Sequence, residues 1–288
     1  MKYRRVFHNN KLQKQFERDG FITVNPLSDA EISHLIEFHD QTHGDNESQP
    51  GYYNTADHYD IATKYKVRDE FKSLYGPHMD KLVIDYKIVF CNYNVKKSGA
   101  DSKLFLHQDY SYADEDEYMS LNAWTPLTDL RLDNSFLGIV KASNKFVNRV
   151  HGRNMGSKYS NITDYITGNF TDKLLVNSGT VVIWDHCMLH HSPPNTSGKI
   201  RIALSNIMIP KEADVAQYIL EPEEPNVMKA YKVDEDFLID MRPNEAIMGR
   251  ECFKRQPYER IPVTEAEFAT SYKAANSLSF LSRLRDMM

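Results

Sequence analysis

The sequence contains few cysteines and no long apolar run. Cys91, Cys187 and Cys252 are the only cysteines in 288 residues, and none of them lies close to another. An odd number of isolated cysteines argues against a disulfide framework and fits a reducing compartment. No apolar stretch approaches the length that crosses a bilayer, and the basic N-terminus lacks the apolar segment of a secretory signal. We therefore expect a cytoplasmic protein without a membrane partner.

A basic surface, an internal repeat and a low-complexity tract are also missing. The chain carries 35 Lys and Arg against 40 Asp and Glu, a net charge of -5, and its basic residues are scattered. Proteins that bind nucleic acid usually cluster positive charge on one face. We therefore exclude nucleic acid as a partner. The length allows one large domain or two small ones, with a sizeable core.

The first part of the chain has helical patterns around one short strand. Residues 21–24 (FITV) predict a strand, and Ser28 with Glu31 forms a capping box at the start of an amphipathic helix. Residues 44–62 lack a period and predict a long irregular loop. Residues 67–76 predict a second helix that ends near the glycine at its last position.

Short segments of strand formers follow from residue 82 onward. They are rich in β-branched and aromatic residues and are separated by polar turns. The predicted strand segments are residues 82–95, 103–112, 118–127, 134–142, 173–185 and 200–210. Many short strands without intervening helices favour an antiparallel sandwich or jelly roll over a parallel sheet. We therefore expect a mainly β fold with flanking helices.

The C-terminal part is charged and punctuated by prolines before a final helix. Thr264 and Glu267 form a second capping box at the start of this helix. One face of the helix is marked by Phe268, Tyr272, Ala275 and Leu278. We expect this face to pack on the sheet or on a second subunit.

The triplet His-x-Asp occurs three times, at residues 58–60, 78–80 and 107–109. The first lies in the predicted irregular loop and the second where a helix is predicted to begin, so we interpret both as structural or surface residues. Only the third lies in a strand pattern, which directs His107 and Asp109 to the same side. These two residues are either a core histidine with a partner carboxylate or two ligands of a metal site.

A third ligand is expected from the segment GTVVIWDHCMLHHSPPN, which contains His186, His190 and His191. A zinc protease motif is excluded, because the segment has a strand pattern and two prolines, and Cys187 stands where the motif requires glutamate. A structural zinc site with Cys187 and His190 stays open. Two histidines and one carboxylate form the facial triad of non-haem Fe(II) oxygenases, which leaves three metal positions open.

Four segments resemble, in the same order, the motifs of the phytanoyl-CoA dioxygenase family of Fe(II)- and 2-oxoglutarate-dependent oxygenases. They are FERDGFITVNPLSDAEISHLIEF, LHQD, LNAWTPLTDLRLDNSFLGIV and LHHSPPNTSGKIRIAL, and the resemblance covers about residues 16–210. It implies a double-stranded β-helix, which is a cupin-like jelly roll, in a single oxygenase domain over residues 1–288. A helical N-terminal part (1–81) would precede the jelly-roll core (82–210), and a C-terminal extension (211–288) with a helix would follow.

The resemblance also implies roles for single residues. His107, Asp109 and His190 would bind Fe(II), and Arg201 would bind the distal carboxylate of 2-oxoglutarate, which suits a planar bidentate donor. Three further residues, which would contact the same cosubstrate or serve as ordinary strand packing, are Asn94, Trp124 and Ser192. Two departures from the family pattern are His191, which stands where glycine is usual, and the loop KASNKF at residues 141–146.

The implied reaction is oxidative decarboxylation of 2-oxoglutarate with O2, coupled to hydroxylation or another oxidation of an unactivated C–H bond. The substrate would be a small molecule in a biosynthetic or tailoring pathway. Because Asp109 is a carboxylate, no metal position is vacant for chloride, and a halogenase is not expected. Tyr110 and Tyr112 follow the ligands in the chain, and alternation places them near the substrate at the mouth of the site.

The acidic residues 114–117 have two interpretations. They form a solvated loop, or they line the entrance, where they would repel a CoA thioester and favour a neutral or cationic molecule. Two other classes of protein stay open, a zinc-binding protein and a non-catalytic jelly-roll binding protein. Both a monomer and a homodimer are compatible with the sequence.

Overall fold

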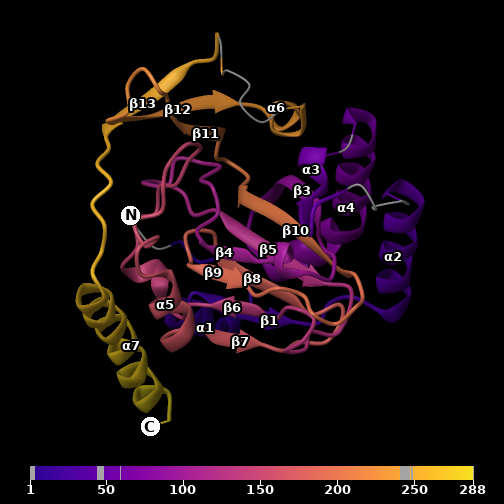
Figure 1. Cartoon of the computed structure of the whole chain (residues 1–288), viewed down its shortest axis with the longest axis horizontal. Helices are drawn as coiled ribbons and strands as arrows, with labels where there is room; N and C mark the ends of the chain where they lie inside the picture. The colour runs from indigo at the N-terminus through magenta and orange to yellow at the C-terminus, as the bar shows by residue number, and fades with distance from the viewer. Residues whose placement is uncertain (1–3, 44–48, 59, 241–246, 248, 288) are drawn as a thin grey trace.

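Three antiparallel sheets are formed by the described part of the chain (Figure 1). The computed structural model describes residues 4–43, 49–58, 60–240, 247 and 249–287. The six-stranded sheet contains, in spatial order, β1 (Phe21–Val24), β8 (Val181–Asp185), β5 (Leu121–Pro126), β10 (Arg201–Pro210), β3 (Tyr86–Lys96) and β2 (Tyr52–Asn54). The four-stranded sheet contains β4 (Leu104–His107), β9 (His190–Ser192), β6 (Leu137–Ile139) and β7 (Asp172–Leu174).

These two sheets pack face to face through a shared apolar cluster. Trp124 on β5 and Trp184 on β8 come from the larger sheet, and Leu137 and Ile139 on β6 come from the smaller one. Each strand of the larger sheet is antiparallel to its neighbours. The prediction of a mainly β, antiparallel sandwich with flanking helices is confirmed.

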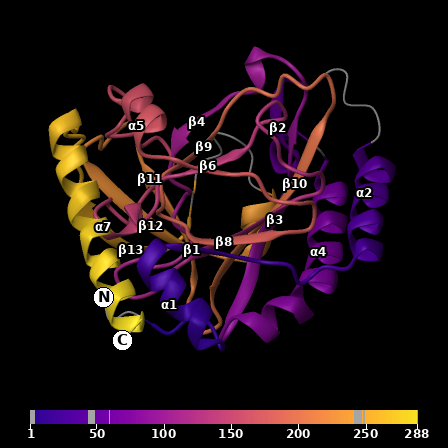
Figure 2. The same ribbon diagram turned by 90° about the horizontal axis from the view of Figure 1, so that it is seen from below.

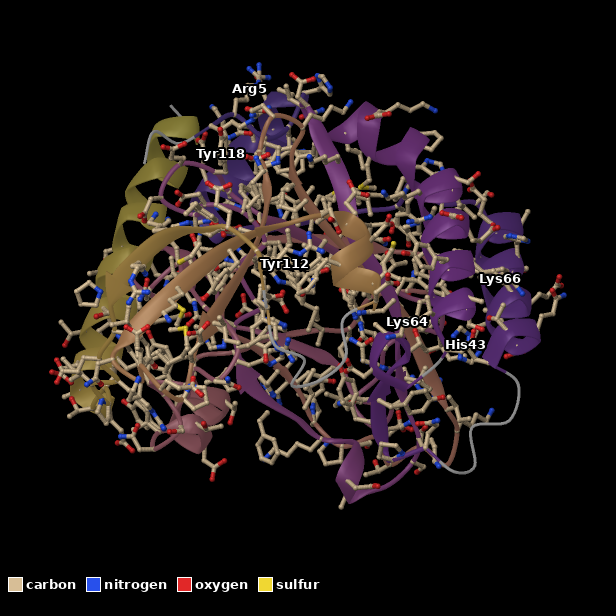
Figure 3. The ribbon with its side chains drawn as sticks, turned by 90° about the horizontal axis from the view of Figure 1, so that it is seen from above. Arg5, His43, Lys64, Lys66, Tyr112 and Tyr118 are labelled. Atoms are coloured by element: carbon tan, nitrogen blue, oxygen red, sulfur yellow. The ribbon has the colours of Figure 1, made fainter. Side chains whose placement is uncertain are left out.

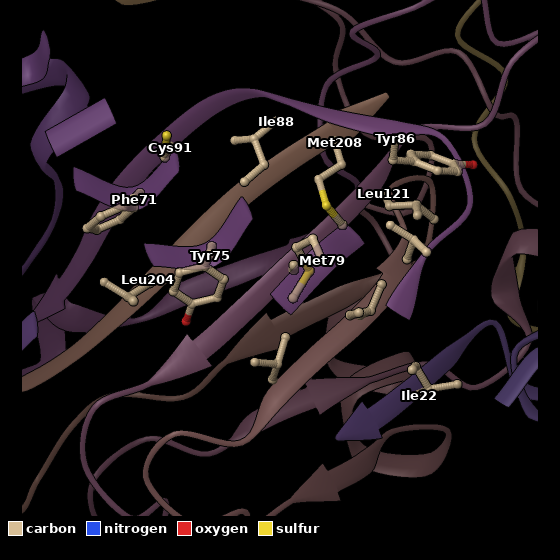
Figure 4. Close-up of a cluster of buried hydrophobic side chains, with 14 of the residues drawn as sticks. Ile22, Phe71, Tyr75, Met79, Tyr86, Ile88, Cys91, Leu121, Leu204 and Met208 are labelled. Atoms are coloured by element: carbon tan, nitrogen blue, oxygen red, sulfur yellow. The ribbon is translucent and has the colours of Figure 1, made fainter. Parts of the chain in front are cut away.

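Helices cover the outer face of the six-stranded sheet. They are α2 (Asp29–His43) and α4 (Ile61–Leu82), which lie together on one side of the molecule (Figure 1). The side chains of Phe71, Tyr75 and Met79 on α4 point at Leu204 and Met208 of β10 (Figure 4). The larger sheet is therefore buried on both faces, which explains why β10 reads as an almost continuous apolar run.

The prediction that the second helix ends near Gly76 is wrong, because α4 continues through Pro77 to Leu82. Its buried residues Val67, Phe71, Tyr75 and Met79 recur every four positions across the glycine. Burial of this apolar stripe offsets the cost of one proline in the helix.

The predicted irregular loop at residues 44–62 contains regular structure in its second half. The short strand β2 pairs with β3 at the edge of the larger sheet, and α3 (Thr55–His58) follows it directly. The loop prediction is wrong for these residues, since three strand residues are too few for a visible period. Residues 44–48 and 59 lie outside the described residues.

The first and last long helices begin as the sequence predicts. Glu31 accepts hydrogen bonds from the backbone N–H and the hydroxyl of Ser28, and Glu267 does the same for Thr264 at the start of α7 (Glu265–Met287). The other described helices are α1 (Asn10–Asp19), α5 (Thr163–Asn169) and α6 (Glu235–Asp240), with 3-10 turns η1 (Ala100–Ser102) and η2 (Ser143–Lys145). No helix among the described residues is both long and apolar enough to cross a membrane.

The charged C-terminal region forms the third sheet, which the sequence does not predict. Its strands are β11 (Val215–Leu220), β12 (Val227–Val233) and β13 (Cys252–Pro257). Charged side chains conceal the strand pattern, for example Lys229, which is paired with Glu221 and Glu224. This sheet lies at the opposite end of the molecule from β7 (Figure 1).

Helix α7 packs on a cluster around α5 rather than on the face of a large sheet (Figure 2). Phe268 is buried, with its ring centroid 5.3 Å from Phe170 and 5.5 Å from Phe146, and Tyr272 lies beside Phe170. Ala275 is also buried, as predicted for this face. The side chain of Leu278 lies outside the described residues.

We expect Phe268→Ala to lower the free energy of unfolding by about 3–5 kcal/mol, because it leaves a cavity among aromatic rings. Phe253 on β13 is 40% exposed, so Phe253→Ala is a matched control with an expected loss below about 1 kcal/mol. Urea unfolding followed by circular dichroism measures both variants. Equal losses for the two variants would contradict the packing of α7 described above.

Candidate metal centre

His107, Asp109 and His190 meet at one end of the four-stranded sheet. His107 is the last residue of β4 and lies opposite His190, the first residue of β9, in the ladder between them. Asp109 Oδ1 lies 3.6 Å from His190 Nε2 and 4.0 Å from His107 Nε2. One possible ligand atom from each residue lies within 4.8 Å of the other two. The structure thus brings together the three residues that the sequence selects.

The local reason for this geometry differs from the prediction. The expected strand over residues 103–112 ends at His107, so Asp109 does not reach the centre by strand alternation. Its backbone N–H instead donates to the carbonyl of His186, 3.2 Å away, just after β8. A contact with the segment that follows β8 of the six-stranded sheet therefore holds the carboxylate beside the histidines.

Hydrogen bonds orient each ligand atom toward the centre. His107 Nδ1 donates to the carbonyl of Phe105 (2.8 Å) and His190 Nδ1 to that of Met188 (3.0 Å), which leaves both Nε2 lone pairs available. Asp109 Oδ2 accepts from Asn122 Nδ2 (3.0 Å) and Trp184 Nε1 (3.1 Å), which leaves Oδ1 facing the histidines. The centre is therefore preorganised for a cation.

The ionisation of these groups also favours a cation. Burial and the neighbouring His190 lower the pKa of His107 to about 4. Burial raises the pKa of Asp109, but the two histidines and the donors Asn122 and Trp184 outweigh burial and hold this pKa below its usual value. At neutral pH the centre thus offers a neutral imidazole and a carboxylate, the forms that bind metals. Two nitrogens and one oxygen fit the donor set of a facial triad.

We expect Trp184→Phe to weaken Fe(II) binding about tenfold, because Asp109 loses one of its two orienting hydrogen bonds. Tyr93→Phe is a matched control, since it removes one buried aromatic donor that bonds to the carbonyl of Leu35, away from the centre. Anaerobic equilibrium dialysis with Fe(II) measures both affinities. An unchanged affinity of the Trp184 variant would show that this bond does not position Asp109.

Arg201 lies at the start of β10 and is buried beside the centre. Its guanidinium stacks over Trp124 at 5.2 Å, and Nη1 donates to the carbonyl of Ser135 (3.0 Å). Within the part of the chain that the structure describes, nothing accepts a hydrogen bond from its buried Nε. Burial lowers the pKa of Arg201 to about 10, so it stays charged at neutral pH. One edge of this cation is available for an anion.

A buried lysine, which sequence reasoning missed, lies opposite Arg201 in the ladder between β10 and β3. Lys96 is fully buried, and its Nζ donates to Ser135 Oγ and to the carbonyls of Ser192 and Pro193. Burial and the charge of Arg201 lower the pKa of Lys96 to about 6. Without an anion beside it, the amine of Lys96 is therefore mostly neutral at neutral pH, and the guanidinium of Arg201 carries the positive charge of this region.

The remaining residues predicted to contact the cosubstrate line the same cavity as Arg201. Asn94 on β3 accepts a hydrogen bond from the hydroxyl of Tyr52 (2.9 Å), and Ser192 Oγ is 2.7 Å from Ser135 Oγ. Trp124 forms the wall beneath the guanidinium. Their positions fit the expected roles, which stay predictions.

The cavity has a volume of about 360 Å³ and connects the three ligands to Arg201, Tyr110 and Tyr112. Tyr110 stacks on His151 and Tyr112 on Phe90, with ring centroids 5.6 and 6.1 Å apart. Figure 3 shows Tyr112 near the middle of the molecule in its view. Wall residues that sequence reasoning missed are Tyr52, Asp57, Phe90, Asn122, His151 and Ser205.

The interpretation of residues 114–117 as the lining of the entrance is wrong. Asp114 and Asp116 both pair with Lys254 of β13, and Glu115 is buried in an ion pair with Arg149. None of the four acidic residues lines the cavity. The expectation of a fully solvated loop also fails for Glu115, because the C-terminal sheet and Arg149 cover it.

The zinc site suggested for Cys187 and His190 does not form in the described structure. Cys187 lies in a different cluster, with Asp185 and His186. Arg149 fills this cluster and donates to both oxygens of Asp185 (2.6 and 2.9 Å). Burial and Asp185 raise the pKa of Cys187 well above its usual value, so the thiol stays protonated.

The other histidines whose side chains the structure describes lie away from the centre or beside it without joining it. His78 pairs with Glu31 at 2.8 Å, as expected for a structural residue, and the side chain of His58 lies outside the described residues. His191, which departs from the family pattern, is buried against Gly138, where a Cβ would lie 2.2 Å from its Nε2. A glycine on β6 thus makes room for the larger ring.

An antiparallel jelly roll that presents two histidines and one carboxylate at a cavity is the arrangement of non-haem Fe(II) oxygenases. The chain belongs to the phytanoyl-CoA dioxygenase family, whose sequence model matches residues 16–203. The resemblance seen in the sequence is therefore confirmed, and with it the class of 2-oxoglutarate-dependent non-haem iron oxygenases. Among curated proteins, none matches the sequence significantly.

Solved structures of this class share the fold. The carbocyclase SnoK from nogalamycin biosynthesis is 16% identical, with a TM-score of 0.56 over 72% of this chain and 86% of its own. The epimerase SnoN, in complex with Fe3+, 2-oxoglutarate (alpha ketoglutarate) and nogalamycin RO, is 13% identical, with a TM-score of 0.54 over 89% and 96%. HygX from Streptomyces hygroscopicus, with nickel and 2-oxoglutarate bound, is 15% identical, with a TM-score of 0.52 over 71% and 88%. The jelly-roll prediction is confirmed.

Proposed function

We propose that this oxygenase uses Fe(II), 2-oxoglutarate and O2 to oxidise an unactivated C–H bond of a small molecule in a biosynthetic or tailoring pathway. The observation that carries the proposal is one cavity that joins three preorganised metal ligands to a buried, partly unpaired arginine. SnoK and SnoN, which share the fold, come from nogalamycin biosynthesis, and this supports a tailoring role.

His107, Asp109 and His190 would hold Fe(II), since their free ligand atoms converge and their second atoms are hydrogen-bonded. Arg201 would bind the distal carboxylate of 2-oxoglutarate through its available edge, while Ser192 and Trp124 shape the same pocket. The positive charge of Arg201 favours an anion there, and a bound carboxylate would raise the pKa of Lys96 and favour its ammonium form. Charge and hydrogen-bonding capacity thus match this cosubstrate.

When bound, the iron would supply the oxidising power, through O2 and the conversion of 2-oxoglutarate to succinate and CO2. The protein itself would position the metal and the cosubstrate and exclude water from them. Trp124 and Trp184 are almost fully buried beside the ligands and would exclude water from the positions of the metal and of 2-oxoglutarate. Asp109 occupies the third protein position, so halogenation is disfavoured, and hydroxylation is the expected outcome.

One experiment separates this proposal from its two alternatives. The purified protein is mixed anaerobically with Fe(II) and 2-oxoglutarate, the weak visible charge-transfer band is recorded, and succinate is assayed after O2 is admitted. The proposal expects both signals. A zinc-binding protein would bind Zn²⁺ through the same donors without forming succinate, and a non-catalytic binding protein would give neither signal. Absence of both signals under reducing conditions would refute the proposal.

We further propose that residues 1–288 act as a single oxygenase domain. Strands β1 and β2 from the N-terminal part pair with β8 and β3 of the larger sheet, and Phe268 near the C-terminus packs in one cluster with Leu106 on β4. A cytoplasmic location fits the three free thiols. The chain would act as a monomer or homodimer, without nucleic acid or membrane.

A further inference from the structure

The cavity carries opposite charges on different walls. Arg201 supplies the positive charge beside the metal ligands, and Asp57 on α3 supplies a carboxylate that is not a metal ligand. Asp57 is exposed at the wall, and within the described part of the chain its carboxylate has no hydrogen bond or ion pair. A carboxylate held at a cavity without a partner is available to a ligand.

The charge of Asp57 acts on the same region of the cavity as two tyrosines. Burial raises the pKa of Tyr110 and of Tyr112, and Asp57 raises both further. Arg153, which does not line the cavity, lowers the pKa of both phenols; its effect exceeds that of Asp57 at Tyr110, whereas at Tyr112 Asp109 and Asp57 together exceed it. Among the cavity-lining residues that the structure describes, Asp57 is thus the carboxylate near these tyrosines that is not a proposed metal ligand.

Aromatic faces line the space beside this carboxylate. Phe90 and Tyr112 stack with an interplanar angle of 17°, and Tyr110 stacks on His151 at 26°. Aromatic faces attract cations, especially where water is partly excluded. Burial and the nearby His186 lower the pKa of His151 to about 4, so this ring adds no positive charge at neutral pH. The carboxylate of Asp57 and the aromatic rings therefore both favour a positively charged ligand.

We infer that the substrate is a compact molecule with a protonated amine, which Asp57 and the aromatic wall bind. This inference rests on the proposed function, because it takes the metal end of the cavity as the place of reaction. Neutral polar groups at Asn92, Asn122 and Ser205 line the same cavity. The volume of about 360 Å³ lies at the low end for small-molecule sites, and the negative wall disfavours a polyanionic CoA thioester.

Two probes of the same shape test the inference, 2-phenylethylamine and 2-phenylethanol. Each is titrated anaerobically into protein loaded with Fe(II) and 2-oxoglutarate, and binding is measured by calorimetry and by perturbation of the charge-transfer band. We expect the amine to bind about tenfold more tightly than the alcohol, as a charge-assisted hydrogen bond and cation–π contacts at a partly exposed site provide. Asp57→Asn should reduce the ratio to about twofold or less.

Two further variants control for charge and folding. Asp116→Asn removes the same charge from the surface pair with Lys254, outside the cavity, and should keep the full preference for the amine. Asp57→Glu keeps the charge in place and should keep most of the preference. The charge-transfer band of each variant verifies that its metal centre is intact.

Equal affinities for the two probes in the unmodified protein, including no detectable binding of either, would overturn the inference. A preference that persists in Asp57→Asn, or that disappears equally in Asp116→Asn, would also overturn it. In each of these outcomes an intact band and succinate formation leave the proposed function standing. Loss of the band in the unmodified protein would instead refute the proposed function.

Discussion

His107→Ala is expected to abolish the charge-transfer band and the formation of succinate. The variant removes one of three ligands, and the remaining pair, Asp109 and His190, cannot complete a facial triad. Loss of a ligand should exceed the 10- to 100-fold effect typical of orienting residues, so Fe(II) affinity should fall by more than about 100-fold. Iron content after gel filtration gives a measure that does not depend on turnover.

A matched control for this variant is His78→Ala. His78 belongs to another His-x-Asp triplet, but it lies on α4 and pairs with Glu31. It does not line the cavity that contains the metal ligands. This variant should keep the band and the iron content, at a small cost in stability. If His107→Ala retained iron and succinate formation, the assignment of the centre would be wrong.

The three candidate metal ligands could be selected from the sequence because their residue types suit a metal site and because their order along the chain places them in or beside strand segments. Only one His-x-Asp triplet lies among strand formers, and the segment around His190 ends a run of buried strand residues. The structure places Asp109 by a different contact from the one that the sequence pattern predicts. Asp109 follows the end of β4, and a bond to the backbone of His186 places it, an effect that no alternation of side chains predicts.

Residues contributed by loops and short elements could not be selected in this way. Asp57 lies on a helix of four residues, and His151 follows no regular element, so no period marks either of them. Lys96 ends a long strand, where a lysine normally reaches solvent. Its burial depends on carbonyl groups of residues 192 and 193, almost one hundred positions later in the chain. Such contacts are properties of the tertiary structure.

The C-terminal sheet was missed for a related reason. Its strands carry lysines and arginines, a composition that is typical of solvated loops. Ion pairs such as that of Lys254 with Asp114 join segments far apart in the chain, so the sequence pattern does not predict them. This sheet is nevertheless linked to the candidate site, since Asp114 precedes Glu115, which pairs with Arg149, and the carbonyl oxygen of Arg149 lies 3.2 Å from His186 Nε2. Composition could not reveal that role.

Arg201→Ala is expected to raise the 2-oxoglutarate concentration needed for half-maximal turnover about 100-fold. Removing one partner of a buried, hydrogen-bonded charge pair costs about 2–5 kcal/mol, and each 1.4 kcal/mol corresponds to about a tenfold change. The loss should affect KM more than kcat, since Arg201 would contact the end of the cosubstrate away from the iron. Steady-state assays of succinate at varied 2-oxoglutarate separate the two constants.

Two variants give this prediction its controls. Arg201→Lys keeps a positive charge but offers a point charge instead of a planar fork, so it should recover only part of the affinity. Arg131→Ala removes an exposed arginine paired with Asp133 and should leave KM unchanged. Iron binding without 2-oxoglutarate should be equal in all three variants, because none of the substituted residues belongs to the metal cluster. If Arg201→Ala left KM unchanged, the available edge of this guanidinium would not be the carboxylate site, and the buried amine of Lys96 would be the next group to test.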